Sequence, residues 1–466
     1  MSEQEATLDD YTTASKTEVD PVEQNKSRFW GEVPGDWELV QPDGVYEVNP
    51  NPKPVEEPST YIEMDALDTV LPWPRYFGER NAAEFSGKTF SSGDTLFARI
   101  TPCTENGKAA LVPEMRTRVG IGSTEFAVLS PKRERISPWY LFYLSKSHPV
   151  HNYAISRMRG STGRQRVPFD VFRRELDIAL PPLEEQRKIA SVLYTVDQVI
   201  QKTEEIIEQT ERVKQGVRQD ILTRGMIDGD SLRYPPEKSQ EVYEDTRNWT
   251  IPRAWELKKL SEVCTLQVGY AYESNWYRDT GEVRVLRGAN VGYGKPDWSD
   301  TKYLEPKRVE EYQEYRLDSG DIIIGMDRPY TSSGFKISRL SERDIPSLLV
   351  QRVGRYQPND IDKEFLHVVL SDWRYQKQVL RRAQGMDIPH ISKMDILSPK
   401  IPVPPRQEQE RIAEIIATMR ERVQSEKKFG KQLKRLKQGL MQDLLSGEVR
   451  THDKDIEIVD DVLKHG

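Results

Sequence analysis

One long stretch occurs twice in the chain, and this repeat constrains the fold more than any other feature. Residues 181–225 and 404–447 align in register at a constant offset of 223 positions. The residues that recur at this offset are Pro181, Glu185, Gln186, Ile189, Ala190, Lys214, Gln215, Gly216, Gln219, Asp220 and Leu222. Self-similarity at a fixed period marks a repeated structural unit, so the fold has to accommodate a tandem duplication.

Each copy of the repeat is predicted to be one long helix. Pro181 and Pro182 begin the first copy, Glu184 and Glu185 place negative charge in its first turn, and Gly225 ends it; all are typical helix-boundary residues. Apolar residues then recur at alternating spacings of three and four, which predicts a coiled-coil seam. The two seams are expected to contain Ile189, Val192, Val196, Val199, Ile206, Val213, Ile412, Ile415, Met419, Phe429, Leu433 and Leu436. A helix of this length extends ~60 Å at 1.5 Å per residue.

The composition describes a protein of more than one domain. A length of 466 residues suits two to four domains. Two cysteines cannot build a disulfide framework, and neither a signal segment nor a membrane-spanning apolar run is present, so we expect a soluble cytoplasmic protein. The net charge of −7 comes from the two ends, since residues 1–26 carry seven acids against two bases and residues 448–466 six against three. The overall charge therefore does not exclude a nucleic-acid partner.

Two globular segments alternate with the two helices. In the first segment, short β-prone patches are separated by Gly and Pro clusters, which predicts strands and turns, with one helix at 138–147. The second segment restates the first, since SGDIIIGMDRPYTSSG at 319–334 matches SGDTLFARITPCTENG at 92–107. The predicted order is a disordered acidic arm at 1–27, a domain at 28–180, a long helix at 181–225, a polar linker at 226–250, a second domain at 251–401, a second long helix at 402–447 and an acidic tail at 448–466.

The simplest partner for one heptad helix is the other copy in the same chain. An antiparallel pair needs only a short connection, whereas a parallel pair requires the linker at 226–250 to run back along the whole helix, which its length allows with no slack at ~3.3 Å per residue. We therefore expect an antiparallel intramolecular coiled coil with pseudo-two-fold symmetry. The alternative is that each helix pairs with another chain.

Recognisable catalytic motifs are absent from the sequence. It contains no GxxxxGK[ST] phosphate loop, no GxGxxG after a strand and no Cys/His metal spacing. Asp94 and Asp321 could be paired acids, but Ser-Gly-Asp is also a natural turn between strands. We therefore expect a noncatalytic binding protein with no catalytic residue, no metal site and no cofactor.

The positive signal is a pair of basic segments, one ahead of each long helix. The guanidinium group of arginine can form paired hydrogen bonds with phosphates and with O6 and N7 of guanine, and glutamine can do so with adenine. Such segments therefore suit DNA. A solvated basic face or a contact with a partner subunit is the alternative interpretation. The candidate DNA-binding residues are Arg157, Arg159, Arg164, Gln165 and Arg166 in the first domain, Arg381, Arg382, Gln384 and His390 in the second, and Arg99, Lys108, Arg328 and Tyr330 in the loops after the Ser-Gly-Asp turns.

Several of these segments resemble the specificity (S) subunits of type I restriction–modification systems. The resemblance covers nearly everything from Phe29 to Gly447, and the duplicated order of domain and helix is its most distinctive mark. The segments that carry it are IPRAWEL at 251–257, ITPCTENGK at 100–108, LPPLEEQRKIA at 180–190 and PPRQEQERIA at 404–413. The acidic arm and the acidic tail are not part of the family pattern.

The resemblance implies a fold and a function together. The fold would be α+β, with two duplicated mixed α/β target recognition domains that each read half of a bipartite, asymmetric DNA target, joined by two long helices that set the spacing. Two methyltransferase (M) subunits and motor-nuclease (R) subunits would dock on the chain and bring S-adenosylmethionine, ATP and Mg²⁺, none of which has a site in this chain.

Two other functions and one unexplained feature accompany this interpretation. The chain could be a coiled-coil scaffold whose two domains bind proteins, or a self-contained nuclease or methyltransferase, which the missing motifs disfavour. Gly216 and Gly439 occupy the same place in the two helices, where glycine costs about 1 kcal/mol relative to alanine. Either a backbone approaches them closely or they are inherited from the duplication without a role.

Overall fold

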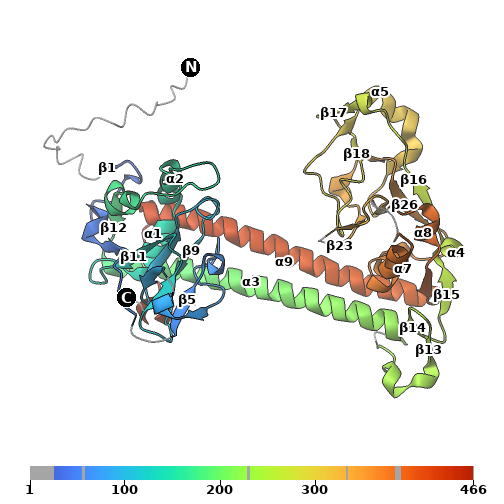
Figure 1. Ribbon diagram of the computed structural model, residues 1–466, viewed down its shortest axis with the longest axis horizontal. Helices are drawn as coiled ribbons and strands as arrows, with labels where there is room; N and C mark the ends of the chain where they lie inside the picture. Colours follow the sequence, from blue (N-terminus) through green and yellow to red (C-terminus); the bar gives the residue numbers. More distant parts are fainter. Residues whose placement is uncertain are drawn as a thin grey trace. The chain divides into compact units, whose positions relative to one another are not determined.

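The structure is a computed structural model that describes residues 26–54, 58–84, 86–227, 231–331, 334–383 and 390–464. The chain divides into two compact units (Figure 1). Unit 1 contains Met1–Ile206 and Lys427–Gly466, and unit 2 contains Ile207–Glu426. Of the arm predicted at 1–27, only Lys26–Ser27 lie within the described residues, and they form strand β1.

Unit 1 is built on two small sheets. One is antiparallel, in the order β4-β11-β8-β9, and the other has the order β6-β5-β10-β7, in which β5 and β10 run parallel. Two further pairs, β12-β3 and β1-β2, complete the strands. The bounds are β2 Gly31–Glu32, β3 Glu38–Val40, β4 Tyr46–Val48, β5 Ser59–Ile62, β6 Gly78–Arg80, β7 Lys88–Phe90, β8 Thr95–Ala98, β9 Ala109–Leu111, β10 Gly120–Gly122, β11 Phe126–Pro131 and β12 Ile178–Leu180.

Unit 2 repeats this topology. Its sheet β16-β26-β21-β24 corresponds to β4-β11-β8-β9, and its second sheet, β17-β19-β18-β25-β20, contains the parallel pair β18-β25 where unit 1 has β5-β10. The bounds are β13 Tyr243–Asp245, β14 Thr250–Pro252, β15 Glu256–Lys259, β16 Cys264–Val268, β17 Tyr277–Arg278, β18 Arg284–Leu286, β19 Tyr303–Leu304, β20 Arg316–Leu317, β21 Ile322–Gly325, β22 Tyr330–Thr331, β23 Gly334–Phe335, β24 Ile337–Arg339, β25 Ser347–Leu349, β26 Val353–Pro358 and β27 Lys400–Val403. The duplicated α+β fold predicted from the sequence is confirmed.

The short helices also correspond between the units. Unit 1 has α1 (Pro138–Lys146) and α2 (His148–Ser156), and unit 2 has α6 (Lys363–Leu370) and α7 (Trp373–Ala383) in the same places. Unit 2 also contains α4 (Leu260–Val263), α5 (Pro306–Val309) and α8 (Lys393–Leu397). Where α8 stands in unit 2, unit 1 has one π-helical turn, Val171–Glu175.

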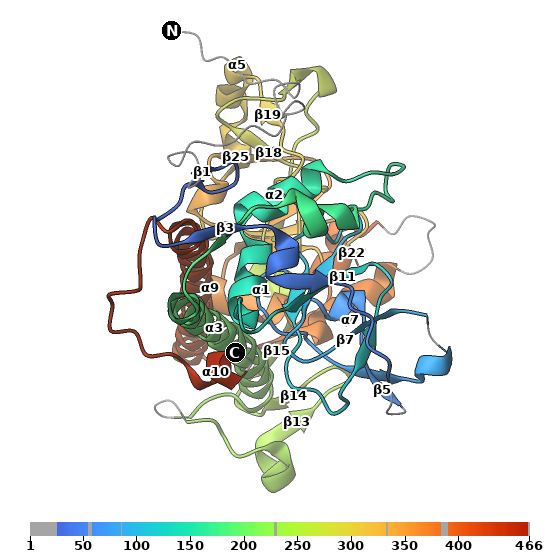
Figure 2. The same cartoon turned by 90° about the vertical axis from the view of Figure 1, so that its left-hand side faces the viewer.

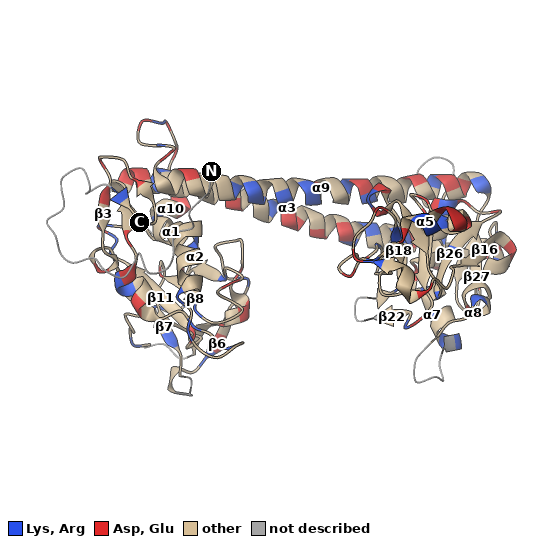
Figure 3. Ribbon diagram, turned by 90° about the horizontal axis from the view of Figure 1, so that it is seen from above, with Lys and Arg blue, Asp and Glu red and all other residues tan. Residues whose placement is uncertain are grey.

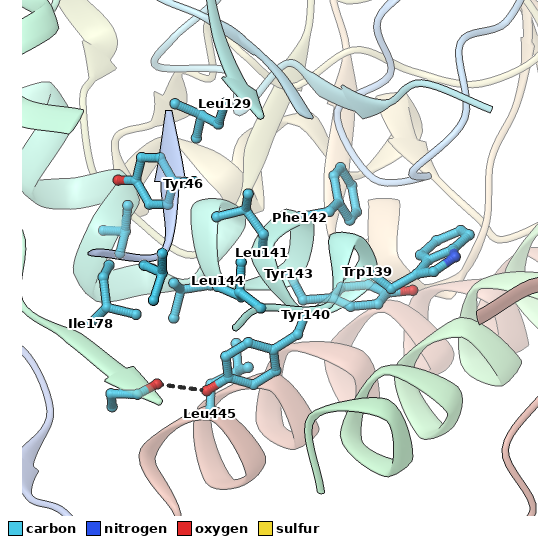
Figure 4. Packing of buried hydrophobic residues seen from close by; sticks show 14 of the residues in the cluster. Tyr46, Leu129, Trp139, Tyr140, Leu141, Phe142, Tyr143, Leu144, Ile178 and Leu445 are labelled. Carbon is cyan, nitrogen blue, oxygen red and sulfur yellow. Dashed lines mark hydrogen bonds between the residues drawn. The ribbon is translucent and has the colours of Figure 1, made fainter. Parts of the chain in front are cut away.

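Helix α1 is the centre of the core of unit 1. Its sequence WYLFYL is buried on all sides, as expected for a helix that lies between two layers rather than on a surface. Tyr140 is fully buried and donates its hydroxyl hydrogen to the Ala179 carbonyl, 2.9 Å away (Figure 4). This hydrogen bond satisfies a polar group that would otherwise be costly inside an apolar cluster.

The two long helices are α3 (Leu183–Arg224) and α9 (Arg406–Ser446). Within unit 1, Lys434 pairs with Glu204 at 2.7 Å and Lys437 pairs with Asp197 at 2.6 Å. A later position on α9 thus meets an earlier position on α3, so the helices are antiparallel; Figure 2 shows them side by side. Within unit 2, the end of α3 and the start of α9 share one apolar cluster.

The predicted seam is only partly correct. Ile189, Ile412 and Leu433 are buried, and Val192, Val196, Ile206, Ile415 and Met419 are partly buried. The prediction is wrong for Val199, Val213, Phe429 and Leu436, whose exposed fractions are 39%, 54%, 46% and 54%. The buried face contains polar side chains, including Asp197, Thr203 and Lys437. A pattern that counts only apolar residues therefore predicts exposed neighbours of these residues as seam positions. Figure 3 shows charges of both signs along these helices.

The start of each long helix is held by the same set of contacts, which we call the Trp–Glu–Arg lock. In unit 1 the Trp37 indole donates to Glu185 at 3.0 Å, and Arg450 donates two hydrogen bonds of 2.9 Å to the same carboxylate. In unit 2 Trp255 donates to Glu408 at 3.0 Å and Arg233 donates to it at 2.7 Å. Each arginine comes from the segment that follows the other long helix.

The glutamine next to each glutamate explains why both residues recur. Gln186 accepts from the Ser137 backbone at 2.8 Å and donates to the Pro181 carbonyl at 2.8 Å. Gln409 accepts from the Asp362 backbone at 2.7 Å and donates to the Pro404 carbonyl at 2.9 Å. Ser137 and Asp362 are the N-cap residues of α1 and α6, so the glutamine fixes the first domain helix against the long helix.

The linker and the tail are both folded where the structure describes them. The predicted linker contains β13, which pairs with β14, and two short 3-10 helices, Pro236–Lys238 and Gln240–Val242. The tail contains α10 (Asp460–Lys464), and its Val462 is part of the core of unit 1. Among the described residues, no helix combines the length and the apolar character needed to cross a membrane.

A pair of neighbouring substitutions checks the observed seam. Ile200 is fully buried and Val199 is exposed, so Ile200→Ala is expected to lower the free energy of unfolding by about 2–5 kcal/mol. Val199→Ala is the control and is expected to change it by no more than about 0.5 kcal/mol. Chemical denaturation followed by tryptophan fluorescence measures both; equal losses would contradict the seam.

A second pair checks the lock. Burial by itself would raise the pKa of Glu185, but the hydrogen bonds from Arg450, Thr451 and Trp37 outweigh it and hold the pKa below its ordinary value of 4.5. Glu185→Gln is therefore expected to cost about 2–3 kcal/mol near neutral pH.

The pH dependence of that loss has a definite sign. A lowered carboxyl pKa stabilises the fold above the unfolded pKa near 4.5, and the contribution is lost as the pH falls through the lowered value. The difference between wild type and Glu185→Gln should therefore shrink in acid. Glu184→Gln is the matched control, because its side chain is 76% exposed; a loss equal to that of Glu185→Gln would contradict the lock.

Candidate nucleic-acid interface

Some of the predicted DNA-binding residues meet at one corner of each domain, whereas others lie elsewhere. In unit 1 the segment after β8 pairs with the returning loop 159–167: Ile100 and Arg166 form a β-bridge, and the Val167 backbone donates to the Arg99 carbonyl at 2.9 Å. In unit 2 Asp327 and His390 form the bridge in the same place. We call these two places the reading corners. Each contains residues that lie far apart in the sequence.

A tight loop forms the outer part of the corner in unit 1. The Arg159 and Arg166 backbones pair with each other, and Gly160 and Gly163 between them have positive φ of 131° and 79°. A Cβ atom on Gly160 would lie 2.9 Å from the Arg164 carbonyl oxygen, so only glycine fits this turn. The loop exposes Arg159 and Arg164, while Gln165 is partly buried.

Arg99 and Arg166 share one carboxylate. Arg166 reaches both oxygens of Glu125, with Nη2–Oε1 at 2.8 Å and Nε–Oε2 at 3.0 Å, and Arg99 Nη1 lies 3.5 Å from Oε2. Arg99 also stacks over the Phe169 ring at 4.1 Å. These two arginines therefore hold the corner together, and a bidentate pair of this kind is among the stronger charged contacts.

Two other predicted residues of unit 1 also have acidic partners. Arg157 pairs with Glu175 at 2.9 Å. Lys108 donates to Asp65 at 2.9 Å and to the Met64 carbonyl at 3.2 Å, and its side chain is 18% exposed. Both contacts join segments that are separate in the sequence, which gives these residues a structural role in the free protein.

The corner in unit 2 is arranged around Asp327. His390 Nδ1 lies 2.6 Å from Oδ1, and Arg352 donates to Oδ2 at 2.8 Å. Burial alone would raise the pKa of Asp327, but these two partners outweigh it and lower the pKa. Arg328 and Arg352 both have positive φ, 44° and 63°. Non-glycine residues in that region are uncommon, and such strain tends to occur at functional sites.

A basic cavity of about 540 Å³ adjoins this corner. Its lining includes Arg287, Arg328, Lys336 and Arg352, and Asp327 is the one acid among the described lining residues. Of these basic residues, sequence reasoning selected only Arg328. Nothing local in the sequence marks Lys336 or Arg352 as neighbours of Arg328, because the sheet brings them together.

The remaining predicted residues of unit 2 lie on other elements, β22 and α7. Tyr330 begins β22 and is 58% exposed. Arg381 and Arg382 are exposed at the end of α7, where they contact the Asn248 side chain at 3.4 Å and the Gln378 carbonyl at 2.6 Å. Gln384 lies outside the described residues.

The two reading corners share a backbone but differ in charge. Strand pairing makes Glu125, before β11, equivalent to Arg352, before β26, and the two bridges make Arg166 equivalent to His390. The acidic residue of the corner is thus Glu125, before β11, in unit 1 and Asp327, after β21, in unit 2. Because the acidic and basic side chains occupy different positions in the two corners, the corners present different groups to a ligand.

Gly216 and Gly439 have no close neighbour on their outer side. A Cβ atom built on either meets nothing within 4 Å. Neither glycine is therefore required by contact with the other long helix. No cluster of three or more His, Cys, Asp or Glu side chains suited to a metal ion occurs in the described part of the chain.

Comparisons with known proteins agree on one family. The model of the type I restriction modification DNA specificity domain matches twice, at residues 34–212 and 252–435. The EcoAI specificity subunit of Escherichia coli is 27% identical over 87% of this chain and 81% of its own length. The MjaVIII specificity subunit of Methanocaldococcus jannaschii is 32% identical over 71% and 75%.

Solved structures share the fold. The type I restriction–modification S subunit from M. genitalium superposes with a TM-score of 0.52 at 16% identity, covering 88% of this chain and 96% of its own. A chain from a study of complex assembly and conformational transition in the type I system gives a TM-score of 0.50 at 21% identity, covering 90% of this chain and 100% of its own.

One substitution checks the corner of unit 1. Arg164 is exposed and carries no acidic partner among the described residues, so Arg164→Ala is expected to weaken binding to DNA and to reduce the salt slope by about 1. Arg135→Ala is the matched control, because Arg135 follows the opposite end of β11 and pairs with Glu38. Fluorescence anisotropy across a salt series measures both. An unchanged slope for Arg164→Ala would assign Arg164 to the solvated surface.

Proposed function

The chain belongs to the family of type I restriction–modification specificity subunits, and from this membership we propose that it reads a bipartite, asymmetric DNA target. Each domain reads one half of the target through its reading corner. The observation that carries this proposal is the occurrence of the same backbone corner twice with different charged groups, Glu125 with Arg166 in one and Asp327 with Arg352 in the other.

The corner of unit 1 contains two kinds of arginine, those exposed to solvent and those paired with Glu125. Arg159 and Arg164 are exposed, while Glu125 compensates Arg99 and Arg166. The exposed arginines suit phosphate oxygens and the edges of DNA bases, because they do not have to break an ion pair before they bind. The cavity in unit 2 is lined by several arginine guanidinium groups. These groups suit the major-groove edge of guanine, which presents two hydrogen-bond acceptors.

The long helices supply the second element of the proposal. Two half-sites read from one face of DNA lie about one helical turn apart, ~34 Å, or a multiple of it. A continuous antiparallel pair built from α3 and α9 is a suitable spacer, because its length is fixed by the number of helical residues.

Catalysis belongs to partners in this proposal. Methyltransferase subunits bring S-adenosylmethionine, and motor-nuclease subunits bring ATP and Mg²⁺. The residues of this chain bind and orient DNA and hold the partners, and they transfer no group themselves. The open outer side of the long helices at Gly216 and Gly439 leaves room for a docked chain.

Mapping methylated adenines tests the proposal. The chain expressed with its methyltransferase subunit is expected to methylate a motif of two specified halves separated by a fixed unspecified spacer. A single contiguous motif would contradict the two-domain reading. No methylation and no binding to DNA, with an intact complex, would favour the scaffold function instead.

Separate substitutions in the two corners assign the halves. Arg164→Ala is expected to relax or weaken one half of the motif only, and Arg352→Ala the other half only, with about 1–3 kcal/mol of discrimination lost at an affected base pair. Arg135→Ala is again the control. Loss of both halves by either variant would show that the corners do not act separately.

A further inference from the structure

A second cavity in unit 2 shares no lining residue with the cavity at the reading corner, and its lining contains cations. It has a volume of about 240 Å³ and lies among the end of α3, the start of α9, α6, α7 and the β23–β24 region. Its lining includes the cations Lys214, Arg218 and Arg420 and also His367, and no Asp or Glu among the described residues. A cavity that concentrates positive charge in this way is suited to a negatively charged group.

Two buried nitrogen atoms of the lining have no hydrogen-bond partner. Arg218 Nε and His367 Nε2 are both out of contact with solvent, and neither has a partner among the described residues. Nearly all buried polar groups in folded proteins are satisfied, so these two nitrogens are unused hydrogen-bonding groups in side chains that line the cavity.

The acids around the cavity pair with other cations, and Glu211 pairs with Lys214. Glu364 pairs with Arg420 at 3.0 Å through one oxygen and with Arg339 through the other. Glu364 therefore pairs with Arg420 and Arg339, and Arg218 has no acidic partner among the described residues.

The surrounding charges act on His367. Burial, followed by Arg420 and Arg339, lowers the pKa of His367 to about 4, with Arg218 contributing in the same direction and Glu364 opposing. The imidazole is therefore neutral at pH 7. An anion placed beside it would favour the protonated ring and raise this pKa.

We propose that this cavity is a binding site for a small oxyanion of the size of one phosphate group, held by Arg218, His367 and Arg420. The volume of about 240 Å³ admits such a group but not a base pair. The aromatic side chains of Tyr293 and Phe335 also line the cavity, so the phosphate can be free or can belong to a nucleotide whose base contacts them. The proposal is independent of the reading corners.

Histidine NMR of the full chain tests the proposal. The ring signals of His367, assigned with His367→Gln, are followed while inorganic phosphate replaces chloride at constant ionic strength. The signals are expected to move, and the pKa of His367 is expected to rise by about one unit or more. Adenosine monophosphate is the second probe: tighter binding than phosphate identifies a nucleotide site, and weaker binding a site for the free anion.

Paired variants on α3 show whether the cavity is responsible. Arg218→Gln is expected to weaken phosphate binding about tenfold or more, equivalent to about 1.4 kcal/mol. Arg212→Gln is the control, because Arg212 is 74% exposed and pairs with Glu208 on the same helix. Unmoved His367 signals in the wild type with both probes, or equal weakening by both variants, would overturn the proposal.

Discussion

The Trp–Glu–Arg lock is the interaction on which the rest of the structure depends. A buried carboxylate is costly unless it is paired and hydrogen-bonded, and Glu185 is satisfied by Trp37, by Arg450 and by the Thr451 backbone. These partners come from the domain that precedes α3 and from the segment that follows α9. The lock therefore closes each unit from three separate parts of the chain, and it requires the long helices to be antiparallel.

A glycine makes each lock possible. Gly225 and Gly447 follow the two long helices with φ of 62° and 78°, the left-handed conformation in which helices commonly end. A Cβ atom on Gly225 would lie 2.6 Å from Glu408 Oε1, and one on Gly447 would lie 2.5 Å from Pro34 Cγ. The chain can turn back toward the start of the other helix only because nothing larger occupies these positions.

How much the sequence could predict depends on whether a feature is local or is assembled across the chain. The repeat, the long helices and the strands follow from spacing and boundary residues. The apolar pattern predicts Val199 and Leu436 on the seam, but both are exposed, because the buried face includes the Asp197–Lys437 ion pair, which an apolar pattern omits. The reading corners required the sheet to bring Glu125 to Arg166, a pairing that no sequence spacing indicates.

The lock and the corners differ in how far their residues recur between the two units. The lock keeps the same residue types in both units, since any change would leave a buried charge unpaired. At the corners the equivalent positions differ in charge, since Arg352 replaces Glu125 and Asp327 replaces Ile100, and the backbone pairing persists. Partly exposed charges can be exchanged at little cost to stability, so a duplicated scaffold of this kind can keep its fold while its two domains come to bind different ligands.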